Sequence, residues 1–483
     1  MKNTFALINR TPPDVLSLIP NYWEGSDKDK GLIALTHVCR GWRELFTSRP
    51  SLWTRLDCTS ANKTKTYIER SKYCPLEICL GQVNDASRLE EALILAATHV
   101  SRIGTMSVSG SLNQVLPILV EQFSCSVPLL EKLNISIVCN QAPVLPDDLF
   151  DGDLSSLYEL RLAGVITSLS WRGLLNLTTF ELCRVPEGRI LLTQLLDFFE
   201  SAPHLRCIKL HDSIPNSSNA PAERVVSLPH LKYLSITAQP AHSILLNHFS
   251  IPAGVSLRLK FTFRGGESPV PSYLPQSLGN LENLCHITTV NLCFGTKRRS
   301  VRLNGPSGDL CIIGRWTCGT DHDNVGTSRF LRSLDRFDVS RSRRLAIRWC
   351  NYRPKATTRV GGYPLYRTLR SMEDLRTLTL TECNNLPFVF TLNPNKSTDK
   401  IVLCPKLEEI TLYIKLPDQF HINELLSMAE ERSLRGAKLA GITIVSMDGL
   451  APPMEVFQLR KHVSRVECKF DDTLPAWDTL PVT

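Results

Sequence analysis

The chain has 483 residues, of which 43% are hydrophobic and 21% are charged, a composition typical of a folded rather than a disordered protein. Its net charge of +8 is small for this length, so it permits an acidic partner without requiring one. The N-terminus lacks a signal-peptide pattern and no apolar run approaches the roughly 18 residues that a membrane-spanning helix needs. We therefore expect a protein of the cytoplasm and/or the nucleus that does not bind membranes, with its 16 cysteines reduced and mostly buried.

Residues 11–53 concentrate large apolar side chains in short helical patterns. Pro12 and Pro13 can open a first helix, because the first turn contains backbone N–H groups that have no acceptor within the helix. Asp14 then suits the positive end of the helix dipole, and Pro20 ends this short helix.

Two further helices are predicted in the same stretch. The second is capped by Ser26 or Asp27 and carries apolar residues as far as Cys39. The third continues the pattern through Phe46 and stops before Pro50. A unit of about 40 residues is too small to bury this much apolar surface alone. The stretch therefore either docks onto a partner or packs on the domain that follows it.

Three pieces of this stretch, in order, resemble the F-box, namely Pro12-Pro13-Asp14-Val15-Leu16, Val38-Cys39-Arg40-Gly41-Trp42-Arg43 and Leu52-Trp53. The resemblance covers about a tenth of the chain and implies binding to the small Skp-type adaptor of cullin-based ubiquitin ligases. Carried over by position, the adaptor-binding residues are Pro12, Pro13, Val15, Leu16, Ile19, Leu32, Leu35, Val38, Cys39, Trp42, Leu52 and Trp53. The chain departs from the family at Pro20, where an aromatic is usual, and in the long polar connection 21–30.

A second pattern begins after a predicted polar helix at 61–73 and a short strand from Leu76 to Leu80. Three apolar residues recur with two and then one residue between them, and the middle residues of the first six copies are 27, 27, 20, 28 and 26 positions apart by subtraction. The copies are Ile103-Met106-Val108, Leu130-Leu133-Ile135, Leu157-Leu160-Leu162, Leu177-Phe180-Leu182, Leu205-Ile208-Leu210, Leu231-Leu234-Ile236, Ile287-Val290-Leu292, Leu375-Leu378-Leu380, Leu407-Ile410-Leu412, Leu439-Ile442-Ile444 and Val463-Val466-Cys468.

This spacing is the sequence sign of leucine-rich repeats, in which each copy supplies a short strand and a returning segment covers the core. Helical returning segments are predicted at 112–123, 190–199, 242–249 and 422–434. The copies lack a dependable Asn or Cys at the turn position, so the array is irregular. A run of unrelated βα units in a compact α/β domain is the competing interpretation.

Between residues 255 and 366 the pattern weakens, which indicates an irregular insert. Val255 to Phe263 alternates strictly and predicts a strand, and Arg302 to Trp316 predicts a hairpin with its turn at Asn304-Gly305-Pro306.

Catalytic and cofactor motifs are weak in this sequence, so we expect a non-catalytic chain with no cofactor and no metal. Patterns for phosphate-binding loops, dinucleotide-binding loops and nucleophile elbows are absent. Cys311, Cys318 and His322 have spacings that zinc sites seldom use, and a fourth ligand is missing.

An arginine-rich stretch lies between Arg329 and Arg353, interleaved with aromatic residues, and Lys297-Arg298-Arg299 and Arg302 are candidates to join it in space. Guanidinium groups suit carboxylates and phosphates, so Arg341, Arg343, Arg344 and Arg348 are candidate substrate-binding residues. The alternative is a solvated face in which Asp335 and Asp338 act as local partners, and nucleic-acid binding is the least favoured.

The sequence thus predicts an α+β protein in which a small three-helix F-box precedes an irregular α/β leucine-rich-repeat solenoid. The predicted parts are a tail (1–9), the F-box (10–57), a linker helix and first strand (58–80), the repeat region (81–470) and a second tail (471–483). This arrangement resembles F-box proteins with leucine-rich repeats, including large families of mushroom-forming fungi. It implies a substrate adaptor of a cullin-type ligase that binds a Skp-type adaptor, a cullin scaffold and an unknown target protein. The alternatives are an interaction scaffold without ubiquitin chemistry, an enzyme on an α/β domain and an arginine-mediated nucleic-acid binder.

Overall fold

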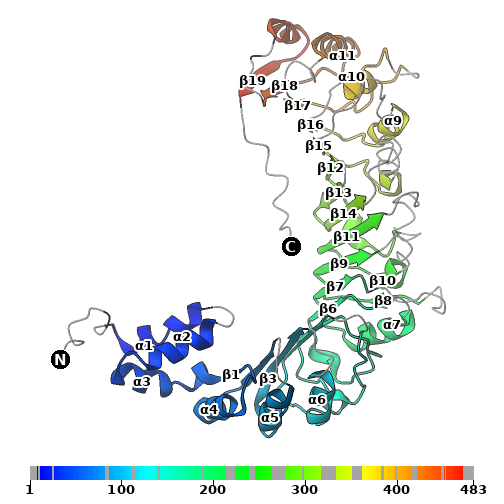
Figure 1. The fold of residues 1–483 in the computed structure, drawn as a ribbon. Helices are drawn as coiled ribbons and strands as arrows, with labels where there is room; N and C mark the ends of the chain where they lie inside the picture. The colour runs from blue at the N-terminus through cyan, green and yellow to red at the C-terminus, as the bar shows by residue number, and fades with distance from the viewer. Residues whose placement is uncertain are drawn as a thin grey trace. The chain divides into compact units, whose positions relative to one another are not determined.

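The computed structural model describes residues 8, 11–23, 27–81, 86–110, 115–138, 142–186, 189–213, 224–238, 245–263, 274, 278–295, 298–316, 333–350, 362–381, 386–396, 400–414, 421–447, 451 and 453–470. The chain packs into two compact units. The first is Met1–Leu205 with Asp212–Asn219, and the second is Arg206–His211 with Ala220–Thr483. Each unit is mixed α/β and is built around a mostly parallel sheet (Figure 1).

The first unit begins with short helices, α1 (Pro13–Leu16), η2 (Ile19–Tyr22), α2 (Asp27–Thr36), α3 (Arg40–Thr47) and η3 (Pro50–Trp53). We call residues 13–53 the N-terminal helical segment. The predicted second helix is three residues too long, because the observed helix α2 ends at Thr36. The Nε of Arg43 donates to the backbone carbonyl of Thr36 at 2.9 Å. Cys39 is extended and forms the N-cap position of α3, so Val38 and Cys39 lie between the two helices.

The sheet of the first unit is entirely parallel. Its strands pair in chain order and are β1 (Arg55–Leu56), β2 (Leu76–Leu80), β3 (Ile103–Gly110), β4 (Lys132–Ile137), β5 (Glu159–Ala163) and β6 (Thr179–Cys183). The connecting elements are α4 (Ala61–Ser71), α5 (Ala86–Ala97), η4 (Val100–Arg102), α6 (Val115–Gln122), η5 (Leu149–Gly152) and η6 (Leu174–Asn176), and α7 (Leu192–Ser201) follows β6. Helix, strand and helix thus alternate along the chain, as parallel pairing requires.

The repeated apolar triplets explain why these strands pair as they do. The middle residues of successive triplets are register partners on neighbouring strands, and all of them are buried. With the two preceding strands, the row is Leu56, Ile78, Met106, Leu133, Leu160 and Phe180. A shift of one residue would turn each apolar side chain to the other face, so this row fixes the register.

The second unit repeats this arrangement with an antiparallel interruption. In spatial order its strands are β7 (Cys207–His211), β9 (Tyr233–Ala238), β11 (Val255–Phe263), β14 (Gly308–Trp316), β13 (Arg298–Gly305), β12 (Thr289–Gly295), β15 (Arg344–Cys350), β16 (Thr377–Thr381), β17 (Glu409–Ile414), β18 (Gly441–Ser446) and β19 (Arg465–Phe470). A separate pair is formed by β8 (Val226–Ser227) and β10 (Phe249–Ser250). The buried row also continues here, for example from Val290 to Leu345 and on to Leu378.

The antiparallel interruption is formed by β12 to β14 and lies within the range 255–366 for which an irregular insert is predicted. Both the strand at Val255 to Phe263 and the hairpin ending at Trp316 are confirmed, and the hairpin lies between β11 and β12. The turn needs glycine at Gly308, whose φ is +129° and where a Cβ atom would lie 2.6 Å from the carbonyl oxygen of Val255. Asn283 is buried nearby, and its amide donates to the carbonyls of Val255 and Asp309.

Helices in the second unit are α9 (Gly362–Arg370), α10 (Leu386–Leu392) and α11 (Ile422–Leu434), with η9 (Glu282–Leu284), η10 (Ser333–Arg336) and η11 (Met454–Lys461). The returning helices predicted in both units occur at α6, α7 and α11, whereas the one predicted at 242–249 is wrong. Its described part has only a 3-10 turn at 245–248, and Phe249 belongs to β10. Phe249 pairs there with Val226, and this strand pairing overrides the weak helical pattern.

The expectations about cysteine state and membrane-spanning helices can be compared with the described residues. Every cysteine whose state is described is a free thiol, but only Cys58, Cys311 and Cys404 of these twelve are buried, so the expectation of mostly buried thiols is wrong for the described residues. Burial raises the pKa of the Cys58 and Cys404 thiols to about 12. Among the helices that the structure describes, none combines the length and the apolar character needed to cross a bilayer.

The aromatic cluster beneath β6 offers a test of the packing. Phe180 lies with its ring centroid 4.5 Å from that of Phe198 and 5.9 Å from that of Phe199, and all three are buried. We expect Phe180→Ala to lower the free energy of unfolding by about 3–5 kcal/mol, because the truncation leaves a cavity. Urea denaturation followed by far-UV circular dichroism measures this change.

Leu175→Ala is the matched control, because Leu175 lies close by in η6 and is exposed. It should change the free energy of unfolding by about 0.5 kcal/mol or less. Equal effects of the two substitutions would contradict the packing described for β6 and α7.

Candidate partner-binding surfaces

The N-terminal helical segment has a small core of its own. Trp42 and Phe46, one helical turn apart on α3, are both buried, with ring centroids 5.8 Å apart in an edge-to-face arrangement. Leu32 of α2 is buried too. The Trp23 ring approaches α2 so closely that a Cβ atom at Gly31 would lie 2.6 Å from it. Close helix packing therefore holds the segment together.

Trp53 joins this segment to helix α4. Its ring is buried, its Nε1 donates to the carbonyl of Phe46 at 2.9 Å, and its centroid lies 5.0 Å from that of Tyr67 on α4. The guanidinium of Arg70 lies over the same ring, 4.2 Å from its centroid. Trp53 is thus enclosed by its own chain from both sides.

A charged network reinforces the same junction. Helix α4 is capped by Ser60, whose hydroxyl accepts from the backbone N–H of Lys63 at 3.2 Å. The Lys63 ammonium forms ion pairs with Asp29 of α2, at 2.9 Å, and with Asp57. Both pairs are partly shielded from water, so they are stronger than ordinary surface pairs.

The pKa values of this network follow from burial and from its charges. Burial alone would raise the pKa of the Asp57 carboxyl, but hydrogen bonds and charge from Lys63, with hydrogen bonds from Thr59, outweigh it and lower that pKa. Burial would lower the pKa of Lys63, but Asp57 and Asp29 raise it. Burial, followed by the charge of Asp29, raises the pKa of Tyr67 to about 12.

Several apolar side chains of the N-terminal helical segment remain in contact with solvent. Val15 on α1 is 52% exposed, Leu18 in the next turn 48%, Ile33 on α2 40%, and Val38 before α3 50%. We call these four residues the exposed apolar set. In a segment that otherwise packs well, uncovered aliphatic side chains mark candidate contacts for a partner.

The predicted adaptor-binding residues divide by burial into three groups. Leu16, Leu32, Trp42, Leu52 and Trp53 are buried, Ile19, Leu35 and Cys39 are half-buried, and Pro12, Pro13, Val15 and Val38 are exposed. The tryptophans named as anchors are therefore core residues of the isolated chain, and their contact with a partner stays a prediction. Leu18 and Ile33 are exposed but are not among the predicted adaptor-binding residues. The F-box resemblance identifies residues of the motif, and it does not tell which side chains the fold leaves exposed.

The arginine-rich stretch is described only in part. Arg344 and Arg348 lie on β15, while Arg341 and Arg343 precede it and are exposed. The predicted members Arg329, Phe330, Arg332, Tyr352 and Arg353 lie outside the described residues. Among the others, Arg336 is half-buried and Phe337 is buried.

The acidic residues expected to neutralise this stretch have other partners. Asp335 forms an ion pair with Arg367 of α9 at 3.5 Å. Asp338 accepts hydrogen bonds from the hydroxyl and the N–H of Ser340, which lower its pKa. The charge of Arg341 adds to that lowering without an ion pair.

Strand parity decides which of the more distant cations join this stretch. Register partners on neighbouring strands point to the same face of the sheet. Arg302 on β13 is the partner of Asn291, and Asn291 is the partner of Ala346 on β15. Arg302 therefore faces the same way as Arg344 and Arg348, which lie two residues on either side of Ala346. Arg299 has the opposite parity and is buried on the core face. The side chains of Lys297 and Arg298 lie outside the description.

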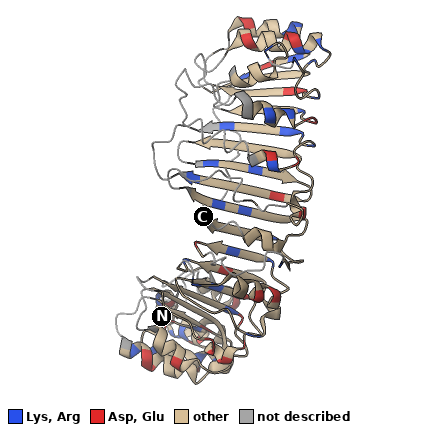
Figure 2. Ribbon diagram, turned by 90° about the vertical axis from the view of Figure 1, so that its right-hand side faces the viewer, with Lys and Arg blue, Asp and Glu red and all other residues tan. Residues whose placement is uncertain are grey.

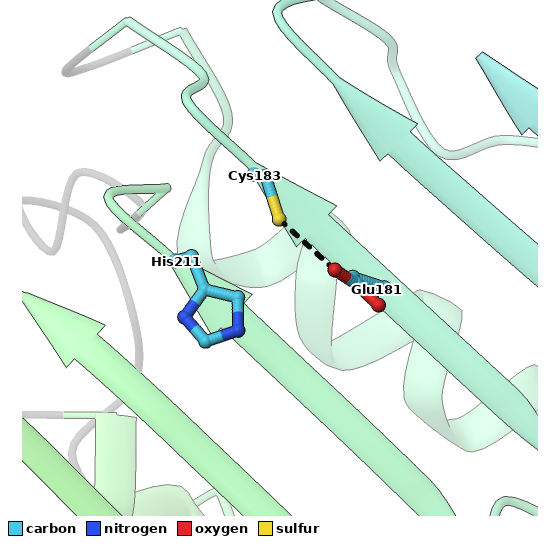
Figure 3. A group of neighbouring side chains, drawn as sticks. All are labelled: Glu181, Cys183 and His211. Carbon is cyan, nitrogen blue, oxygen red and sulfur yellow. Dashed lines mark hydrogen bonds between the residues drawn. The ribbon is translucent and has the colours of Figure 1, made fainter. Parts of the chain in front are cut away.

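The structure describes several of the residues that could serve as metal ligands. Figure 3 shows Glu181 and Cys183 on β6, where the Cys183 thiol donates to the Glu181 carboxylate with a distance of 3.5 Å. His211 belongs to the second unit, where its Nδ1 lies 2.9 Å from the Thr237 hydroxyl. Cys311 is buried on β14, and Cys318 and His322 lie outside the described residues.

Comparison with the models of known protein families and with curated proteins found no match to this chain. The coarse architecture, a mixed α/β chain with extensive parallel sheet, therefore stands on the structure alone.

The Lys63 network predicts a pH-dependent stability. Lys63→Ala leaves two partly buried carboxylates without their cation, so we expect the free energy of unfolding at neutral pH to fall by about 1–3 kcal/mol. The lowered pKa of Asp57 means that its contribution is present above the ordinary Asp pKa and is lost as pH falls through the folded-state value. The deficit of the variant should therefore shrink on acidification, which melting temperatures at several pH values would measure.

Lys65→Ala is the matched control, since Lys65 is an exposed lysine on the same helix. It should have little effect at any pH. A Lys63→Ala deficit that persists unchanged at acid pH would show that lost packing, and not the ion pairs, explains it.

Proposed function

We propose that this chain is the substrate-recognition subunit of a cullin-type ubiquitin ligase, attached to a Skp-type adaptor through its N-terminal helical segment. The resemblance of the segment to the F-box supplies the partner class. The observation that carries the proposal is the exposed apolar set, which lies on a segment whose core residues Trp42, Phe46 and Trp53 are buried.

The energetics favour docking of such a segment. Fully burying a Val, Leu or Ile side chain contributes about 1.5–3 kcal/mol. The four residues are between 40% and 52% exposed, so covering each contributes about half of that, and together they still offer a useful share of a specific binding energy. The internal core around Trp42, Phe46 and Trp53 supports this use, since it holds the exposed residues in place before binding. A preformed surface loses less conformational entropy on association than a disordered one.

The rest of the chain fits the role of a target receptor. We propose that its repeated strands and helices form an irregular leucine-rich-repeat array, supported by the in-register rows of buried triplet residues in each unit. Such arrays present extended binding surfaces. On this proposal the chain carries out no chemical step and accelerates ubiquitin transfer by raising the effective concentration of the target.

The decisive experiment is a binding measurement between the purified full-length chain and a Skp-type adaptor. Val15→Ser combined with Val38→Ser should weaken binding about tenfold or more, because each substitution removes about 1 kcal/mol or more of apolar burial. Isothermal titration calorimetry measures the affinities, and circular dichroism verifies that each variant is folded.

Ile94→Ser combined with Leu129→Ser is the matched control, because both residues are exposed aliphatics of the first unit outside the segment. This control should bind as the parent does. If the folded parent itself does not bind the adaptor, the proposal fails, and the segment is then a structural cap on an interaction scaffold. Trp42 and Trp53 are poor choices for the test, since their truncation would unfold the segment.

A further inference from the structure

The sheet of the second unit has one apolar face and one face on which cations gather. Buried and half-exposed residues alternate along its strands, as in β11, where Leu257 and Leu259 are buried and Arg258 and Lys260 between and after them are not. Helices α9, α10 and α11 lie on one side of the strands from β15 onward (Figure 1). Lys and Arg recur on neighbouring strands in the middle of this sheet (Figure 2).

Register brings these cations into rows that cross the strands. One row runs from Lys209 on β7 through Ser235 to Arg258 on β11, and from there through Cys311 to Arg302 on β13. The cations in this row are two strands apart, which is about 10 Å.

Other cations of the same parity lie on either side of that row. Lys260 follows Arg258 on β11, Arg315 lies at the end of β14, and Arg344 and Arg348 lie on β15. We call the set formed by Lys209, Arg258, Lys260, Arg302, Arg315, Arg344 and Arg348 the basic sheet face.

Four of these arginines lack acidic partners. Within the part of the chain that the structure describes, Arg258, Arg302, Arg315 and Arg344 take part in no ion pair. The Nε atom of Arg302 is buried and has no hydrogen-bond partner there. Because this Nε is buried, a ligand carboxylate would have to bind the outer guanidinium nitrogens of this arginine.

The far end of the same face shows the opposite arrangement. On β19, Arg465 pairs with Glu409 of β17 at 2.7 Å and with Glu467 at 3.4 Å, and Lys469 pairs with Glu467 at 2.9 Å. Arg376, just before β16, pairs with Glu408 at 3.2 Å. The chain therefore neutralises its cations at one end of the sheet, whereas Arg258, Arg302, Arg315 and Arg344 in the middle form no ion pair among the described residues.

We propose that the basic sheet face binds an extended acidic segment of a partner polypeptide. The inference rests on the proposed function only in calling that segment a ligase substrate, since the binding itself needs no adaptor. Carboxylates recognise the planar fork of arginine with paired hydrogen bonds. In the polyproline II conformation a chain advances about 3.1 Å per residue with three residues per turn, so acidic residues at every third position lie on one side and would match cations about 10 Å apart.

One feature of the cation row favours an acidic polypeptide over a nucleic acid. The row positions between the cations carry Ser235 and Cys311, which are buried and are not aromatic side chains on which bases stack. Asp309, in register between Ser256 and Asn304 on the same face, would repel either kind of anionic ligand and does not distinguish them.

The test uses the full-length chain and a fluorescein-labelled peptide of repeated Glu-Thr-Ser triplets, with binding measured by fluorescence anisotropy at low salt. We expect saturable binding that weakens as salt is added, and no binding of the Gln-Thr-Ser peptide. Arg258→Gln, Arg315→Gln and Arg344→Gln together should weaken binding about tenfold or more.

The control variant carries Arg376→Gln, Arg465→Gln and Lys469→Gln, which remove three ion-paired cations from the same unit and change the net charge equally. It should bind the Glu-Thr-Ser peptide as the parent does. Equal losses in the two triple variants would overturn the proposal, since net charge alone would then explain binding. So would failure of the parent to bind the peptide, or tighter binding of a single-stranded oligonucleotide that only the first triple variant loses.

The outcome is separable from that of the adaptor experiment. The first triple variant leaves the N-terminal helical segment intact, so its capture of the Skp-type adaptor should equal that of the parent. Loss of peptide binding with adaptor binding retained tests this inference alone.

Discussion

In-register stacking of buried residues across parallel strands is the constraint on which the rest of this structure depends. Each triplet supplies one strand, and a strand can bury its apolar residues only if they align with those of its neighbours. Leu133 between Met106 and Leu160 is an example, and Leu378 between Leu345 and Ile410 is another. Because the register is fixed on the buried face, the side chains on the opposite face also form rows. In the second unit, the packing of apolar residues on the buried face thus sets the register that aligns the cations on the opposite face.

The N-terminal helical segment depends on a different interaction. Trp53 is held between the carbonyl of Phe46 and the ring of Tyr67, while Lys63 joins α2 to the loop before α4. These contacts tie a small helical unit to the α/β domain that follows it in the first unit. They explain how so short a stretch folds, and why Trp42, Phe46 and Trp53 are buried while aliphatic residues such as Val15 and Val38 remain exposed.

The two proposed binding surfaces also differ in physical character. The exposed apolar set would gain free energy by removing aliphatic side chains from water, a contribution that hardly changes with salt. The basic sheet face would gain it from charge, which salt screens. On the proposed function, the apolar surface would hold the adaptor and the charged surface would capture targets, and this division would let the two affinities be set independently.

Sequence by itself determined several local elements of this protein, although the helix predicted at 242–249 is wrong. The strict alternation from Val255 to Phe263 and the glycine-containing turn of the following hairpin sufficed to locate β11, β13 and β14, because alternation and turn chemistry act over a few residues. The helix at 422–434 was equally readable from its period. The triplet spacing does not change near residue 206, however, so the division of the chain into two units was not visible in it.

Tertiary structure alone decided which residues are available for binding. Trp42 and Val38 belong to the same sequence motif, yet packing against Phe46 buries the former and leaves the latter half exposed. Arg299 and Arg302 are three residues apart, yet strand parity sends one to the core and the other to the basic face. Exposure depends on neighbours that are distant in sequence, and a local pattern contains no information about them.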